Sequence, residues 1–225
     1  MGWTLDDALL DPGNAKLVSL RYGELKKLEV AAEVLPGLEE LEIIAIGMRK
    51  LPDAVARLRG LVRLDVSDNV MTELPGWLGK LEHLRELSAA SNRIEELPTG
   101  LYDLRKLKEL DLADNELESI DAKLGQLGQL EHLALSGNHL RAIPSSIGRL
   151  AHLVRLYLNQ NQIDALPREV GELGALEELL LADNRLTTLP RELPGVGTLE
   201  WLTLRGNPMS PGERSASTRP CPNAA

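Results

Sequence analysis

The stretch LVRLYLNQNQIDALP, residues 153–167, decides the fold, because its pattern returns along the chain every 23 residues. Apolar and polar residues alternate within it, which is the period of a half-buried strand. Leu156 and Leu158 are therefore expected to point inward, and Arg155 and Tyr157 must point to the opposite face. One strand cannot bury its leucines alone, so we expect neighbouring units to stack around a continuous core.

The repeat units are recognised by their openings, which share two or three leucines and end in a turn residue. These openings are LEELEIIAI (38–46), LVRLDVSDN (61–69), LRELSAASN (84–92), LKELDLADN (107–115), LEHLALSGN (130–138), LVRLYLNQN (153–161), LEELLLADN (176–184) and the shortened LEWLTLRGN (199–207). Ile46 stands where the other units have asparagine. The amide of a turn asparagine can donate to and accept from backbone groups, so we predict a structural asparagine ladder of Asn69, Asn92, Asn115, Asn138, Asn161, Asn184 and Asn207.

A proline usually follows each opening and is expected to turn the chain away from the sheet, because it fixes φ and lacks an amide donor. The fourth full unit has Ile120-Asp121 instead. The LGxL segments that come next are predicted to form short helical or 3₁₀ turns. Their glycines, at positions 79, 125, 148 and 171, are predicted to allow close packing between units.

This pattern, LxxLxLxxNxLxxLPxxLGxLxx, resembles the 23-residue form of the leucine-rich repeat family over about residues 38–209. The resemblance implies an α/β fold: a curved right-handed β-α solenoid with a concave parallel sheet and short helical or 3₁₀ convex segments. We divide the chain into an N-terminal cap with a degenerate first repeat (1–37), seven full repeats and one partial repeat (38–209), and a flexible C-terminal tail (210–225). The tail is rich in serine, proline and charge and cannot bury enough apolar surface to order.

The N-terminal segment has two features of a cap. Thr4-Leu5-Asp6-Asp7 has the form of a capping box and is expected to start a short helix that ends at Leu10. Residues 15–37 then follow the repeat, with Gly23 in the asparagine position. The core positions of this degenerate unit are predicted to be Val18, Leu20, Leu25 and Leu28.

Composition argues against several kinds of partner. The net charge is −9 and no basic block occurs, so binding to nucleic acid or to an anionic membrane is not expected. No apolar run is long enough to span a bilayer, and the first ten residues carry two aspartates where a secretory signal would be basic. Cys221 is the single cysteine, which excludes a disulfide framework. We expect a soluble, cytoplasmic protein.

No catalytic motif was found: GxxxxGK[ST], HExxH, CxxC and GxSxG are all absent. We therefore expect no enzyme activity, cofactor or metal. Cys221 could instead be the nucleophile of a ubiquitin ligase, as in some bacterial relatives, but no folded domain surrounds it. The histidines are interpreted as surface residues rather than a metal site, and Asp68, Asp114 and Asp183 as turn residues rather than calcium ligands; the histidines are His83, His132, His139 and His152.

Function is then expected to lie in the outward residues of the sheet, which fall into two regions. The N-terminal region is acidic and comprises Glu40, Glu42, Asp65, Glu86, Glu109 and Asp111. The C-terminal region comprises Arg155, Tyr157, Glu178, Leu180, Trp201 and Arg205, and is rich in the residue types that dominate binding energies. Two structural alternatives stay open: the tail could cover Trp201, and the acidic residues could form an ordinary solvated face.

The functional hypothesis is a non-catalytic protein–protein interaction scaffold, of the kind used in signal transduction, that binds a partner with a basic region. The alternative is a regulatory subunit of a phosphatase, kinase or small GTPase, which copurification of one activity would distinguish. The identity of the partner and the pathway are left open. We expect a monomer, although edge strands near Val18 and Leu202 could pair with a second copy.

Overall fold

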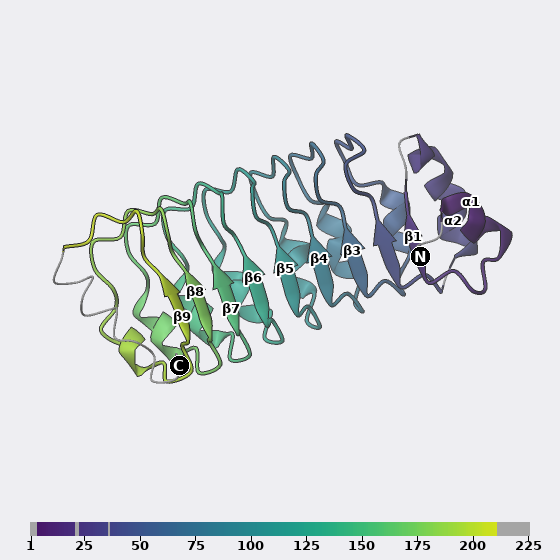
Figure 1. Ribbon diagram of the computed structural model, residues 1–225. Coiled ribbons are helices and arrows are strands. Elements are labelled where there is room, and N and C mark those ends of the chain that lie inside the picture. The colour runs from purple at the N-terminus through teal and green to yellow at the C-terminus, as the bar shows by residue number, and fades with distance from the viewer. Residues whose placement is uncertain (1–3, 21–22, 36, 211–225) are drawn as a thin grey trace.

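The computed structural model describes residues 4–20, 23–35 and 37–210, which form one parallel sheet of nine strands in chain order. Each strand pairs with the next at a separation of 23 residues, as in the pair Leu133 and Leu156. In Figure 1 the strands lie side by side, and the short helices lie behind the sheet. The strands are β1 Leu17–Ser19, β2 Glu40–Glu42, β3 Arg63–Asp65, β4 Glu86–Ser88, β5 Glu109–Asp111, β6 His132–Ala134, β7 Arg155–Tyr157, β8 Glu178–Leu180 and β9 Trp201–Thr203. The predicted solenoid with a parallel sheet is confirmed.

The leucines of successive strands form the core. Leu156 and Leu158 are completely buried, whereas Arg155 is exposed and Tyr157 is half-buried on the opposite side of the strand. The same alternation of buried and outward residues holds in strands β2 to β8. Stacking therefore places every outward side chain on one common face, as the alternation predicted.

The asparagine ladder is also confirmed, since all seven asparagines are buried. Asn161 shows how each member works. Its Nδ2 group donates to the carbonyl oxygens of Leu158, at 3.2 Å, and Asn159, at 3.2 Å, within its own turn. The same Nδ2 group donates to Leu135 O in the preceding unit at 2.9 Å, and Oδ1 accepts from Leu140 N–H at 3.0 Å. One amide thus satisfies backbone groups of two adjacent units.

The first full unit keeps the turn although Ile46 replaces its asparagine. Ala45 and Gly47 both have left-handed backbone angles, with φ of 55° and 70°. Asn69 of the next unit supports the turn, because its Oδ1 accepts from Ile46 N–H at 3.2 Å and from Met48 N–H at 2.9 Å. A unit can therefore lack its own asparagine and still be held by its neighbour.

The convex side carries short 3₁₀ helices, as the LGxL segments predicted. Most begin directly after the proline, whose backbone is extended; Pro52, for example, has φ −62° and ψ 140°. The helices are η1 Glu24–Lys27, η2 Asp53–Arg57, η3 Gly76–Lys80, η4 Thr99–Asp103, η5 Ala122–Gln126, η6 Ser145–Arg149, η7 Arg168–Glu172 and η8 Leu193–Gly195.

A glycine at the same repeat position in η3, η5, η6 and η7 sets the spacing between units. A Cβ atom at Gly125 would lie 2.7 Å from the carbonyl oxygen of Ser146, so this contact needs glycine. Ala56 and Tyr102 occupy the same repeat position in η2 and η4. Correspondingly, η2 contacts η3, and η4 contacts η5, less extensively than η3 contacts η4.

Tyr102, in the preceding unit, accounts for the absence of proline from the unit that has Asp121 in its place. Its side chain is only 2% exposed. Burial raises the pKa of the Tyr102 hydroxyl, and a hydrogen bond from the backbone of Asp121 opposes that rise. Asp121 stands at the position of the missing proline, and proline has no N–H to donate. The two departures from the repeat therefore compensate each other.

We expect Gly171→Ala to lower the free energy of unfolding by about 1–3 kcal/mol through overpacking. An added Cβ would lie 2.5 Å from Glu192 Cβ and 3.0 Å from Glu192 O, closer than packed atoms approach. Gly174→Ala is the matched control, because a Cβ at Gly174 meets nothing within 4 Å. Urea unfolding measures both variants, and equal midpoints would contradict the spacing role of Gly171.

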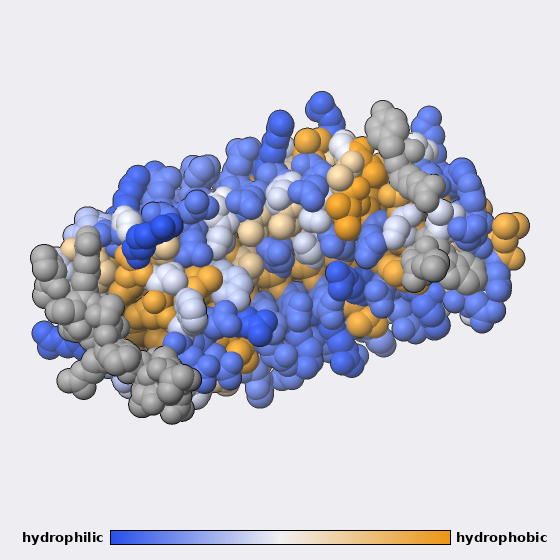
Figure 2. Space-filling view, viewed as in Figure 1, coloured by the Kyte–Doolittle hydropathy of each residue, from blue (hydrophilic) through white to orange (hydrophobic). Residues whose placement is uncertain are grey.

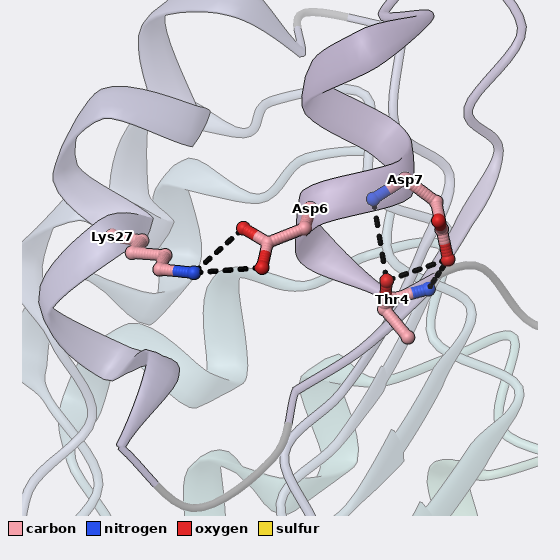
Figure 3. A network of polar contacts seen from close by, with 4 residues as sticks. All are labelled: Thr4, Asp6, Asp7 and Lys27. Carbon is pink, nitrogen blue, oxygen red and sulfur yellow. Dashed lines mark hydrogen bonds and ion pairs between the residues drawn. The ribbon is translucent and has the colours of Figure 1, made fainter.

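The N-terminal segment caps the first strand with two α-helices, α1 Leu5–Leu10 and α2 Leu28–Val34. The predicted capping box is present: Asp7 N–H donates to Thr4 Oγ1 at 3.2 Å, and Thr4 N–H donates to Asp7 Oδ2 at 3.2 Å. Lys27 Nζ joins η1 to α1 through Asp6, at 2.6 and 2.8 Å from its two carboxylate oxygens (Figure 3).

The core prediction for this degenerate unit is right at three positions. Val18, Leu20 and Leu28 are buried, whereas Leu25 is only partly buried. Leu25 lies within η1, which belongs to the cap rather than to the stacked leucine column. The cap also contains the two-turn helix α2, longer than the short turns expected from the repeat.

At the other end, the leucines of the last unit are less protected than those of the preceding unit. Leu199, Leu202 and Leu204 are partly buried, whereas the equivalent Leu176, Leu179 and Leu181 are completely buried. The C-terminal tail from residue 211, including Cys221, lies outside the described residues, and the domain boundaries stay a prediction. Across the described residues, no helix combines the length and apolar character needed to cross a bilayer.

Candidate functional site

The concave face consists of the first and third residues of each strand, on the side of the sheet away from the 3₁₀ helices. Strand pairing arranges them in two columns whose neighbours are about 4.8 Å apart. From β2 to β9, the first column is Glu40, Arg63, Glu86, Glu109, His132, Arg155, Glu178 and Trp201, and the second is Glu42, Asp65, Ser88, Asp111, Ala134, Tyr157, Leu180 and Thr203.

All twelve predicted partner-binding residues are exposed or half-buried. Eleven belong to the two columns, and Arg205 is exposed just beyond the end of β9. The structure therefore places these eleven residues on the face where they were expected. Their role in binding stays a prediction.

A shallow groove of about 380 Å³ crosses the concave face from β3 to β7. Its walls include Asp65 and Asp111, its lining includes the small Ser88 and Ala134, and Tyr157 lies at the β7 end. In Figure 2, hydrophilic residues cover most of the molecule, and hydrophobic residues gather both at the end that carries β9 and toward the end that carries β1. The groove thus joins the acidic region to the region that contains Tyr157.

The acidic region is partly compensated by its own neighbours, which the sequence did not indicate. Glu86 Oε2 lies 3.2 Å from Arg63 Nη1 on the adjacent strand. Asp65 Oδ1 accepts from the amide and the hydroxyl of Ser67, at 3.0 and 2.6 Å. Fewer carboxylates of the acidic region therefore lack a partner than their number alone suggests.

Asp111 is a half-buried carboxylate of the groove. Burial raises its pKa, and the negative charges of Asp65 and Asp114 raise it further, while a hydrogen bond from the Ala113 amide opposes the rise. A cation placed in the groove would relieve this repulsion, because an opposite charge favours the ionised form.

Tyr157 is held in place by Glu178 on the next strand. The Tyr157 hydroxyl donates to Glu178 Oε2 at 2.7 Å, and Arg155 Nε lies 3.5 Å from Glu178 Oε1. Burial raises the pKa of Tyr157, and the hydrogen bond to Glu178 and its negative charge act in the same direction. Glu178 therefore orients Tyr157 and Arg155 instead of presenting a free carboxylate.

Trp201 stands beside this cluster. It pairs with Glu178 across β8 and β9, and 63% of its surface is exposed. Leu180 pairs with Tyr157 on one side and with Thr203 on the other. We call Arg155, Tyr157, Glu178, Leu180 and Trp201 the anchor cluster.

His132 is a groove residue that the sequence interpretation missed as part of the site. It lies between Glu109 and Arg155 in the first column, with Nε2 4.0 Å from Glu109 Oε1. Its Nδ1 atom is buried and has no hydrogen-bond partner among the described residues. Only its outward position in the strand could have indicated this placement.

The turn aspartates were interpreted as structural, and their backbone agrees with that. Asp68, Asp114 and Asp183 have φ between 55° and 57°, and Ser91 and Gln160 adopt the same conformation at the equivalent position. Aspartate tolerates this left-handed geometry better than most residues. Within the described part of the chain, no group of three or more His, Cys, Asp or Glu side chains is placed to hold a metal ion.

Comparisons with known proteins agree with this architecture. A family described as "Leucine rich repeat" matches residues 90–140 and 151–209. The chain is similar to the leucine-rich repeat ectodomain of a plant membrane receptor kinase from Arabidopsis thaliana, solved in complex with Casparian strip integrity factor 2. The two are 30% identical, with a TM-score of 0.75, over 88% of this chain and 26% of that chain.

Two bacterial structures are also similar. A leucine-rich repeat protein of Leptospira interrogans is 27% identical over 90% of this chain and 62% of that chain, with a TM-score of 0.52. An internalin from Listeria monocytogenes, 20% identical over 91% of this chain and 65% of that chain, shares the fold with a TM-score of 0.67. The chain spans about a quarter of the plant ectodomain and less than two thirds of each bacterial structure. No curated protein sequence matches it.

The 23-residue unit, the buried asparagine ladder and the single parallel sheet together define a class of protein, the repeat solenoid. With the family match, the chain is a leucine-rich repeat protein. Domains of this kind are typically non-catalytic scaffolds that bind other proteins.

Proposed function

We propose that this chain is a non-catalytic scaffold that binds a protein partner on its concave face. The observation that carries the proposal is the anchor cluster, in which Glu178 accepts a hydrogen bond from the Tyr157 hydroxyl and pairs with the exposed Trp201 on the next strand. Tyrosine, tryptophan and arginine are the residues that most often dominate binding energy at protein interfaces.

The geometry of the cluster favours tight contact. A side chain that is ordered before binding loses less conformational entropy when the partner arrives. The Tyr157 hydroxyl already donates to Glu178, and Arg155 already lies beside the same carboxylate, so both side chains have a partner in the free protein. Trp201 adds a large apolar surface that water contacts in the free protein.

The groove supports a partner with a basic region. Its Asp111 carboxylate is partly desolvated and lies among other negative charges, so a lysine or arginine of the partner would be attracted there. Such charge complementarity mainly increases the association rate and selects the orientation of the partner. The anchor cluster then supplies most of the affinity.

The double variant Tyr157→Ala/Trp201→Ala is expected to weaken partner binding by at least about 1–2 kcal/mol. Affinity purification with mass spectrometry would first identify proteins retained by the intact chain, and calorimetry would then measure each affinity. Copurification of a phosphatase, kinase or GTPase would identify the partner as an enzyme under regulation.

The matched control is Arg93→Ala/Arg185→Ala, two exposed residues outside the strands. It should retain the partner as the intact chain does. Circular dichroism would show that both variants keep the fold, because none of the four side chains is buried. Equal retention by both double variants would show that the anchor cluster does not carry binding.

A further inference from the structure

A second hollow lies on the convex side, between η2 and η3, and has a volume of about 500 Å³. It is lined by Asp53, Ala56, Arg57, Arg59, Trp77 and Lys80. Ala56 stands where most units have the glycine that permits close contact, and η2 and η3 contact each other less extensively than η3 and η4 do. The hollow therefore results from one departure from the repeat. We call it the convex pocket.

Trp77 is a second departure at the same place. The equivalent positions of the other full units hold small or polar residues, namely Ala54, Gly100, Lys123, Ser146, Glu169 and Glu192. Trp77 is half-buried and packs against the core, and its Nε1–H donates to Asp53 Oδ1 of the preceding unit at 2.8 Å. The indole is therefore held in a fixed orientation in the pocket, where it offers apolar surface to a ligand.

The charge of the convex pocket is opposite to that of the chain. Its lining holds three cations and one carboxylate, whereas the whole protein carries a net charge of −9. Arg57 is paired with Glu29 at 2.6 Å, and the Asp53 carboxylate accepts from Trp77. Arg59 and Lys80 are exposed and have no ion-pair partner among the described residues. Two cations are thus available to a ligand.

We propose that the convex pocket binds an acidic peptide segment of a protein partner. Carboxylates of the segment pair with Arg59 and Lys80, and one of its apolar side chains packs on Trp77. The pocket is open and lies between two short helices, which suits an extended peptide. A nucleic acid is disfavoured, because three cations cannot offset the repulsion between its phosphates and a protein of this net charge.

The proposal is independent of the concave face, since η2 and η3 lie on the other side of the sheet. The test uses the full chain and a short fluorescein-labelled peptide of alternating glutamate and leucine, followed by fluorescence anisotropy. We expect Arg59→Gln/Lys80→Gln to weaken binding about fivefold or more, because two ion pairs are lost. Added salt should weaken binding to the intact chain and affect the variant less.

The control Lys123→Gln/Arg149→Gln removes two exposed convex cations at the repeat positions of Trp77 and Lys80, and changes the net charge equally. It should bind the peptide within about twofold of the intact chain, as expected when no direct contact is lost. A matched decrease in both variants, or equal binding of a glutamine–leucine peptide, would show that net charge or the apolar residues alone are responsible and would overturn the proposal.

Three further outcomes would also overturn it. These are no binding by the intact chain, tighter binding of a phosphoserine peptide than of the glutamate peptide, and self-association in sedimentation velocity that Arg59→Gln/Lys80→Gln abolishes. The last would identify a second copy of this chain as the occupant. A Trp77→Leu variant that keeps the fold but loses affinity for the glutamate–leucine peptide would support the proposed contact with the indole.

Discussion

Replacing Leu156 by alanine is expected to lower the free energy of unfolding by about 2–5 kcal/mol, the largest effect of any single change considered for this protein. Leu156 is completely buried in β7, and it pairs with Leu133 and Leu179 in the neighbouring strands. Alanine would leave a cavity in the leucine column, bordered by the units on both sides. Equilibrium urea unfolding, followed by circular dichroism, measures the loss.

Tyr157→Ala is the control for Leu156→Ala because it changes the adjacent residue of the same strand. Tyr157 points outward and donates one side-chain hydrogen bond, to Glu178. Its loss should cost about 1 kcal/mol or less. Comparable losses for the two variants would contradict the assignment of inward and outward positions.

Asn161→Ala is expected to have the second largest effect, a loss of about 3 kcal/mol, because several buried backbone groups lose their partner together. The Leu140 N–H and the Leu135 carbonyl belong to the preceding unit, whereas the Leu158 carbonyl belongs to the same unit. The Asn161 side chain is only 8% exposed, so the groups that lose their partner lie away from bulk solvent. Urea unfolding again provides the measurement.

Asn159→Ala is the control for Asn161→Ala, because it removes an asparagine that does not belong to the ladder. Asn159 lies two residues earlier, is half-buried, and its Oδ1 accepts from the Ala182 amide at 2.8 Å. We expect a loss of about 1 kcal/mol. If Asn161→Ala unfolds at the same urea concentration as the intact chain, the ladder does not stabilise this protein.

The two proposed binding sites arise from the repeat in different ways. The concave face follows from the alternation that every unit shares, which places two outward side chains per strand in columns. The identity of these side chains decides which groups face a partner. The convex pocket arises where the repeat departs from its consensus, because Ala56 replaces a glycine and Trp77 replaces a small or polar residue. In a repeat protein, binding sites can therefore arise both from the variable positions of the repeat and from substitutions at its consensus positions.

Much of the concave face could be predicted because a strand has only two faces. Once Leu156 was expected to be buried, Arg155 and Tyr157 had to point outward, and the same reasoning placed Trp201 and Glu178. The hydrogen bond between Tyr157 and Glu178 could not be predicted in this way. It depends on rotamers of side chains 21 residues apart, which the period does not specify.

The convex side was harder to predict for a related reason. Most of the sequence predictions used the residues that all units share. The spacing of η2 and η3 depends instead on a glycine that one unit lacks, where Ala56 stands. The compensation between Tyr102 and Asp121 is similar, since each residue alone is only an exception to the repeat. A comparison of each unit with the consensus, position by position, would have indicated both places.

The amino-acid sequence by itself determined the solenoid, its register and the identity of the outward residues, because a 23-residue period of leucines and asparagines is compatible with only one way of burying them. Only the tertiary structure decided which outward residues compensate one another and where the surface is hollowed. Glu178 orients Tyr157, Arg63 pairs with Glu86, and Trp77 closes one side of the convex pocket. These contacts join residues of neighbouring units, and their distances are set by stacking rather than by any local pattern.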